Sequence, residues 1–163
     1  MGSAVTRRVL EVKPGGPWLV LADGAWAVDT GHETAVPFVR SRMWLLPLVQ
    51  RSRNDVEREA HALLGPDDPD LGEALRAMID MGLNAWSDFW IANTLTWMTA
   101  DEIALFSDRV HEIARGHAGS QSTQHAAKRL LKHHGHWSPK NAVAAVLPPP
   151  PSPRPDDSRT GHP

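Results

Sequence analysis

The sequence predicts an α+β protein with small antiparallel hairpins or a meander at the N-terminus, an amphipathic helical region after it, and a disordered proline-rich tail. Three observations support this fold class. Turn-forming residues separate short apolar runs over residues 1–50, apolar residues recur at helical spacing over 51–147, and prolines are frequent from residue 148. We therefore expect a single domain over residues 1–147 and a disordered tail over residues 148–163.

Short strands and tight turns are predicted in the first fifty residues. Pro14–Pro17 is a turn signal, and Asp23-Gly24 predicts a type I′ hairpin turn because glycine readily adopts a positive φ. Pro37 lacks an N–H donor, so it favours an edge position for the last strand. The expected strands are Val5–Val12, Trp18–Leu21, Trp26–Val28 and one more within Val36–Leu46.

Two helices are predicted after Pro47. The first is capped by Ser52 or Asn54 and stops at Gly65-Pro66, and the second opens with a capping pair, Asp70 and Glu73. The first helix is expected to place Val56, Ala60, Leu63 and Leu64 on one face, and the second Leu71, Leu75, Met78, Ile79, Gly82, Leu83 and Trp86.

Two further segments are predicted, and the sequence assigns a single type of secondary structure only to the second. Trp90–Trp97 fits a strand as well as a continued helix, because its apolar residues follow neither period clearly. Ser122–His134 fits a helix that Gly135 ends, with Ala126, Ala127, Leu130 and Leu131 facing inward and Lys128, Arg129 and Lys132 facing outward.

A capping box begins the clearest helix of the chain. The Thr99 hydroxyl is expected to accept from the Glu102 N–H, while the Glu102 carboxylate accepts from the Thr99 N–H. One continuous helix should follow and end near Gly116. Its apolar seam has steps of three and four residues and consists of Ile103, Phe106, Val110 and Ile113. Such a seam closes either an intramolecular helix pair or a two-fold dimer, and we expect a homodimer.

The charge is unevenly distributed along the chain. Residues 51–119 hold six basic and thirteen acidic side chains, whereas residues 120–147 hold four basic and no acidic ones. The basic helix therefore either docks on the acidic segment, lies in solvent, or faces phosphates. Arginine and lysine also flank the Pro14–Pro17 turn, which could grip phosphates as a wing does. The candidate phosphate contacts are Arg7, Arg8, Lys13, Lys128, Arg129 and Lys132.

Catalytic, cofactor and metal motifs are not found in the sequence. The chain has no cysteine, no Walker loop, no Gly-x-Ser-x-Gly elbow and no Gly-x-Gly-x-x-Gly. The cluster His125, His133, His134 and His136 lacks the spacing of zinc ligands on a helix and lies among cations, so we interpret it as a surface cluster. We expect a non-enzymatic protein with no cofactor. Because the sequence has no signal peptide and no membrane-spanning run, we also expect a cytoplasmic protein.

Part of the chain resembles the C-terminal half of actinobacterial winged-helix regulators of the ArsR-like type. The matching positions are Leu95, Thr96, Thr99, Asp101 and Glu102 with the helix that follows, and a Val/Ala-rich stretch, 142–147, that leads into prolines. The resemblance implies a transcription regulator that dimerises through these helices and binds double-stranded DNA. Such regulators place a helix-turn-helix before the wing, and here only hairpin-like segments precede the helices.

Two functional interpretations therefore stay open. The chain is a regulator-like protein, cut short or started late, that uses basic elements on DNA. Alternatively, it is a small partner-binding or immunity-type protein that does not bind DNA.

Overall fold

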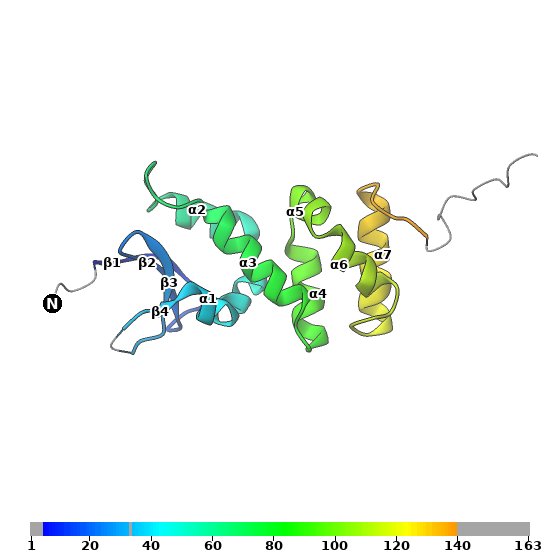
Figure 1. Ribbon diagram of the computed structural model, residues 1–163, viewed down its shortest axis with the longest axis horizontal. Helices are drawn as coiled ribbons and strands as arrows, with labels where there is room; N and C mark the ends of the chain where they lie inside the picture. Colours follow the sequence, from blue (N-terminus) through cyan, green and yellow to red (C-terminus); the bar gives the residue numbers. More distant parts are fainter. Residues whose placement is uncertain (1–4, 33, 140–163) are drawn as a thin grey trace, which may run out of the picture.

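The computed structural model describes residues 5–32 and 34–139, and it confirms the α+β fold class. Four strands come first, and the helices after them extend away from the sheet, so that the sheet and the last helix lie at opposite ends of the molecule (Figure 1). The expected tail over residues 148–163 lies outside the described residues. None of the helices in the described part of the chain is long and apolar enough to span a membrane.

The sheet is an antiparallel meander in which each strand pairs with the next one along the chain. A two-residue turn joins the second and third strands, and both of its residues have a positive φ, 51° at Asp23 and 78° at Gly24. This geometry confirms the predicted type I′ turn. The strands are β1 (Thr6–Glu11), β2 (Trp18–Ala22), β3 (Ala25–Asp29) and β4 (Val36–Pro37).

The strand predicted within Val36–Leu46 is present as β4 at the edge of the sheet, but it is only two residues long. Pairing stops at Pro37, which has no N–H to donate to a longer ladder. The Ser41 hydroxyl donates to the Pro37 carbonyl at 3.0 Å, which stabilises a helical turn instead. The segment forms α1 (Phe38–Ser41) and then a 3₁₀ helix, η1 (Arg42–Gln50), whose leucines enter the core.

Six α-helices follow η1 in the described residues. The Trp90–Trp97 segment is helical, which settles the alternative left open by its sequence pattern. The helices are α2 (Arg53–His61), α3 (Leu71–Leu83), α4 (Asp88–Trp97), α5 (Ala100–Leu105), α6 (Ser107–Ala114) and α7 (Gln121–His133).

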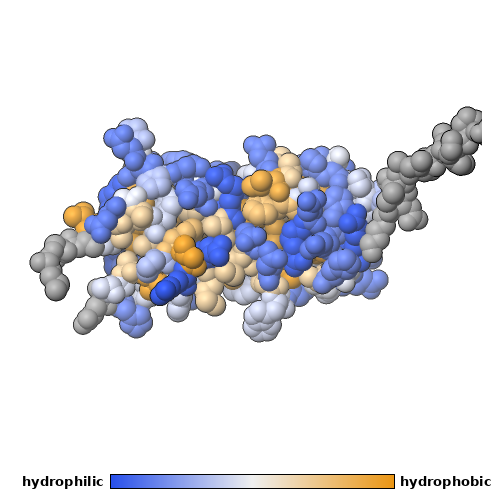
Figure 2. Space-filling view, in the orientation of Figure 1, coloured by the Kyte–Doolittle hydropathy of each residue, from blue (hydrophilic) through white to orange (hydrophobic). Residues whose placement is uncertain are grey.

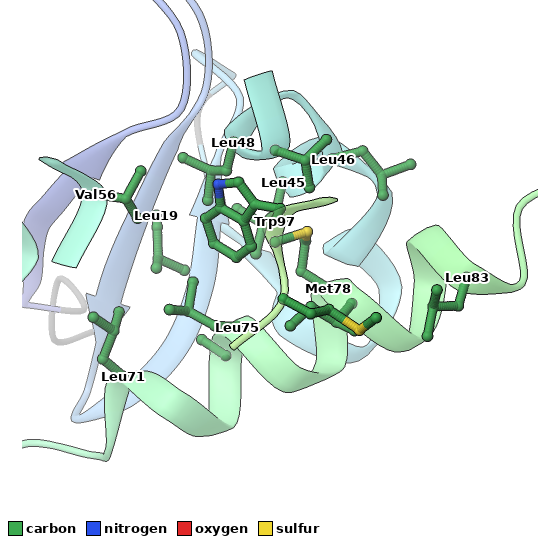
Figure 3. Close-up of a cluster of buried hydrophobic side chains, with 14 of the residues drawn as sticks. Leu19, Leu45, Leu46, Leu48, Val56, Leu71, Leu75, Met78, Leu83 and Trp97 are labelled. Atoms are coloured by element: carbon green, nitrogen blue, oxygen red, sulfur yellow. The ribbon is translucent and has the colours of Figure 1, made fainter. Parts of the chain in front are cut away.

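One hydrophobic core joins the sheet to the helices. Figure 3 shows the Trp97 indole among leucines of η1 and α3, next to Met78 and near Leu19 of β2. The indole Nε1–H of Trp97 donates to the Arg51 carbonyl at 3.0 Å, so the ring is buried without losing its hydrogen bond. Leu19, Leu21, Trp26 and Val28 of the sheet belong to the same core, and α1 and α2 contact the sheet directly at β3 and β1.

Helix α3 buries the predicted face but starts and ends differently. Asp70 occupies the N-cap position without a side-chain capping bond, and its carboxylate pairs with Arg76 at 3.4 Å instead. The helix ends at Leu83, so Trp86 lies beyond it and is 98% exposed rather than part of the buried face. Gly82 lies where α3 meets α4, and a Cβ there would collide with the Thr94 hydroxyl. Glycine thus permits the close crossing of these helices.

Helix α2 also corrects the sequence-based interpretation. It ends at His61, so only Val56 and Ala60 of the predicted face lie in it, and both are buried. Leu63 follows the helix and is 51% exposed, whereas Leu64 packs against the core. Ser52 occupies the N-cap position, but its side chain makes no capping bond.

The capping box at Thr99 is confirmed. The Thr99 hydroxyl accepts from the Glu102 N–H at 3.4 Å, and the Glu102 carboxylate accepts from the Thr99 N–H at 2.9 Å. The single helix expected after it is wrong, because the chain turns at Phe106 between α5 and α6. Phe106 occupies the N-cap position of α6, and its side chain makes no capping bond. The second helix ends just before Gly116, as the sequence predicts.

An ion pair that is largely shielded from solvent connects α2 to this capping box. Two guanidinium nitrogens of Arg53 donate to the two Glu102 carboxylate oxygens at 3.0 and 2.8 Å, and a third donates to Glu57 at 2.7 Å. The guanidinium carbon also lies 4.3 Å from the centre of the Trp97 ring. Desolvation opposes the charge on Arg53, but its hydrogen bonds to Glu102 and Glu57 raise its pKa above the usual value.

Candidate nucleic-acid interface

Helix α7 is held in place at its N-terminus. The Ser120 hydroxyl caps the helix by accepting from the Thr123 N–H at 3.3 Å, and the Asp88 carboxylate accepts from the Ser120 N–H at 2.6 Å. The Ser120 N–H first of all, and then the Thr123 hydroxyl, lower the pKa of Asp88 through their hydrogen bonds to its carboxylate. Thr123, Ala127 and Leu131 lie four residues apart on the buried side. The other side of α7 is therefore fixed toward solvent.

The outward side of α7 carries cations and histidines. We call this surface the basic face, and it consists of His125, Arg129, Lys132 and His133, all exposed, with half-buried Lys128 at its border. No acidic side chain occurs between residues 120 and 147. Within residues 5–32 and 34–139, none of its lysines or arginines forms an ion pair. Figure 2 shows hydrophilic side chains over the end of the molecule that α6 and α7 form.

The end of α7 turns the chain back across the bundle. Gly135 has a φ of 73°, the Gly135 N–H donates to the Lys132 carbonyl at 3.2 Å, and the His136 N–H donates to the Leu131 carbonyl at 2.8 Å. This pair of bonds is a Schellman motif, in which glycine is favoured because of its positive φ. The motif directs the next residue, Trp137, toward α6.

Trp137 fixes the border of the basic face. Its ring stacks on His111 of α6, with centroids 5.7 Å apart and an interplanar angle of 13°. The Lys128 ammonium lies 4.9 Å from the centre of the same ring, which is a cation–π contact. The adjacent Ser138 N–H donates to the His111 Nε2 at 3.1 Å. Lys128 is therefore held at Trp137, whereas Arg129 and Lys132 extend into solvent.

A polar hollow of about 440 Å³ lies beside this contact and is lined by Asp108, His111, Glu112, Arg115 and Ser138. Among the residues that line the hollow, His111 has the side chain best suited to acid–base chemistry. Both of its ring nitrogens, however, are hydrogen-bonded within the protein. Nδ1 lies 2.8 Å from the Ser107 carbonyl, and Nε2 accepts from Ser138. In the described part of the chain, no group of three or more His, Asp or Glu side chains could hold a metal ion.

The N-terminal candidates for phosphate contact lie far from α7. Arg7 pairs with Asp68, and Arg8 pairs with Asp29 at 3.1 Å. Hydrogen bonds lower the pKa of both carboxyls, chiefly from the Arg7 side chain at Asp68 and from the Gly31 N–H at Asp29. Lys13 is exposed in the turn between β1 and β2. Because the sheet and α7 lie at opposite ends (Figure 1), the six predicted residues do not form one surface.

The seam residues are placed inside the molecule. Ile103, Val110 and Ile113 are buried in the core, and Phe106 packs against it at the turn between α5 and α6. Helix α6 packs mainly on α7. The seam thus closes an intramolecular helix pair, so it offers no surface to a second copy.

Sequence reasoning missed Trp137 and its contact with His111. Its only signal in the sequence is an aromatic residue two positions after the helix-ending Gly135. The partner could not be identified in this way, because His111 lies on another helix. Comparison of the chain with models of protein families, with curated proteins and with solved structures found no match.

Proposed function

We propose that the chain is a non-enzymatic, regulator-like protein of the cytoplasm whose basic face on α7 contacts the phosphates of double-stranded DNA. One observation carries this proposal. Arg129 and Lys132 are exposed on one helix face and have no acidic partner in the described residues, whereas Arg7 and Arg8 are paired with aspartates. Lysine and arginine that are not neutralised within the protein can replace the counterions that phosphates bind.

The dimensions of α7 limit the strength of this contact. A helix of 13 residues is about 20 Å long, and its three cations can neutralise about three phosphates. Contacts of this kind do not read base sequence. The expected binding is therefore non-specific, with a dissociation constant of about 10⁻⁴ to 10⁻⁶ M at physiological salt.

The proposed contact rests on the three cations of the basic face, Lys128, Arg129 and Lys132. His125 and His133 are exposed beside them on the same helix.

Binding of a fluorescent duplex at low salt, measured by anisotropy, tests the proposal. The variant Lys128→Ala/Arg129→Ala/Lys132→Ala should bind at least about tenfold more weakly, because each lost phosphate contact removes its counterion release. The control Arg40→Ala/Arg58→Ala/Arg76→Ala changes the net charge equally at exposed residues outside α7. It should bind like the unmodified protein. An equal loss of duplex affinity in the two variants would contradict a contact through α7.

The same measurement bears on the alternative function. A partner-binding protein that does not contact DNA predicts no anisotropy change in the unmodified protein even at low salt. A homodimer stays a separate prediction, and because the Ile103 seam is internal it would need another surface.

A further inference from the structure

An exposed aromatic corner lies between α3 and α4, where Asp88 bonds to Ser120 at the N-terminus of α7. Trp86 is 98% exposed and Phe89 is 52% exposed. The Phe89 ring meets the half-buried Trp90 ring edge-on, with centroids 4.9 Å apart. We call Trp86, Phe89 and Trp90 the aromatic corner. Large aromatic rings gathered on a surface are typical of binding sites rather than of solvent-facing helix ends.

Two aspartates lie on the helices that border the aromatic corner. Asp80 precedes it on α3, and Asp88 begins α4. The N–H of Ser120 and the hydroxyl of Thr123 keep the pKa of Asp88 low, so this carboxylate is ionised at neutral pH. Arg109 of α6, which donates to the Leu83 carbonyl at the end of α3, is paired with Glu112 at 2.8 Å. An occupant should therefore combine an aromatic-binding surface with a positive charge.

The chain itself contains such a segment after the described residues. Six of the eight residues from 148 to 155 are prolines, and Arg154 lies among them. Proline-rich segments favour the polyproline II conformation and dock on exposed aromatic rings at little entropic cost. We propose that the segment Leu147–Pro155 binds the aromatic corner of its own chain, with prolines on Trp86 and Phe89 and Arg154 beside the acidic residues. This contact goes beyond the proposed DNA binding and does not depend on it.

The tail is long enough to reach the corner. Ser138 is bonded to His111 on α6, and Arg109, two residues earlier on the same helix, donates to the Leu83 carbonyl at 3.1 Å. Leu83 precedes Trp86 by three residues, which span at most about 10 Å. Ser138 and Trp86 are thus connected by short steps, which run along α6 from His111 to Arg109, through the Arg109 side chain to Leu83, and along the chain to Trp86. The ten residues from 139 to 148 can span about 33 Å when extended.

Covalent attachment favours the tail over a separate molecule with the same chemistry. A tethered segment faces its site at an effective concentration in the millimolar range. A modest contact between prolines and aromatic rings is then populated within one chain, even where the free peptide would bind weakly.

The indole N–H resonances of the full chain test this proposal by NMR. The chain has seven tryptophans, and the Trp86 resonance is assigned with Trp86→Phe. Replacing the six prolines of residues 148–155 with serine should shift the Trp86 resonance. The Trp97 resonance should stay fixed, because its N–H is bonded to the Arg51 carbonyl inside the core. Arg154→Glu should shift the Trp86 resonance, and the control Arg159→Glu, outside the proline run, should not.

Three results would overturn the proposal. The Trp86 resonance could be identical in the unmodified chain and the serine variant, which would mean that the tail does not touch this ring. It could respond equally to Arg154→Glu and Arg159→Glu, which would indicate a general charge effect. It could also depend on protein concentration, which would assign the contact to the tail of a second copy. DNA binding through α7 would remain unaffected in each case, so the two proposals fail separately.

Discussion

Glu102 offers the sharpest test of how the two halves of the fold are joined. Its side chain is 8% exposed and has two roles, since it closes the capping box at Thr99 and accepts both donors of Arg53. Glu102→Ala removes the acceptor for the Thr99 N–H and leaves Arg53, itself only 16% exposed, with Glu57 as its remaining carboxylate partner.

The size of the loss follows from these contacts. Removing one partner of a buried ion pair costs about 3–5 kcal/mol, and losing a cap costs about 1 kcal/mol. Arg53 keeps Glu57 and the face of Trp97, which reduces the penalty for the charge that remains. We expect Glu102→Ala to lower the free energy of unfolding by about 3 kcal/mol. Glu102→Gln keeps an acceptor at the cap and should cost about half as much.

Urea unfolding at neutral pH measures this difference. Glu112→Ala is the matched control, because Glu112 also pairs with an arginine but its side chain is 52% exposed. The control should lose less than about 1 kcal/mol. A loss below about 1 kcal/mol for Glu102→Ala, or a loss equal to that of the control, would refute the conclusion that this ion pair joins α2 to α5.

Three further variants probe the packing and the start of α7. Gly82→Ala should destabilise the fold by about 1–3 kcal/mol in urea unfolding, because its Cβ would collide with Thr94, and a neutral result would mean that the helices are farther apart. Phe106→Ala should cost about 2 kcal/mol, less than a fully buried ring, since Phe106 is half-buried, and a loss under about 0.5 kcal/mol would place the ring in solvent. Asp88→Asn should destabilise the protein at pH 7. Because the pKa of Asp88 is lowered from 3.8 in the folded state, its contribution is present above that value and is lost at lower pH. The free energies of unfolding of Asp88→Asn and of the unmodified protein should therefore become equal in acid. A difference between them that does not change with pH would contradict the bond to Ser120.

Local signals in the sequence were sufficient where neighbouring residues determine the structure. The Asp23-Gly24 turn and the Thr99 capping box depend on residues within four positions of each other, and both are present. The helix ends at Gly116 and Gly135 follow from the same kind of local preference.

Longer-range packing explains the misses. The apolar run after Pro37 was compatible with a strand, but η1 forms because its leucines are buried in the core, where η1 packs on α3 and α4. The spacing of Ile103, Phe106 and Val110 fits one helix as well as two, so periodicity alone could not reveal the turn at Phe106. Trp86 fits the helical period of α3 but lies after its end.

The candidate interface was predictable only in part. The outward direction of Arg129 and Lys132 follows from helical periodicity, since Ala127 and Leu131 must face inward. The pairing of Arg7 with Asp68 could not be inferred, because 61 positions separate them in the sequence. The position of Lys128 over Trp137 likewise depends on the turn at Gly135 and on His111.

The proposed contact of α7 with phosphates is tested most directly by the salt dependence of duplex binding. The logarithm of the association constant should fall linearly with the logarithm of salt between about 50 and 200 mM, with a slope of about −3 for three phosphate contacts. Replacing Lys128, Arg129 and Lys132 with alanine should bring the slope close to zero. A slope that the triple variant leaves unchanged, or no binding by the unmodified protein at the lowest salt, would contradict the proposed role of α7.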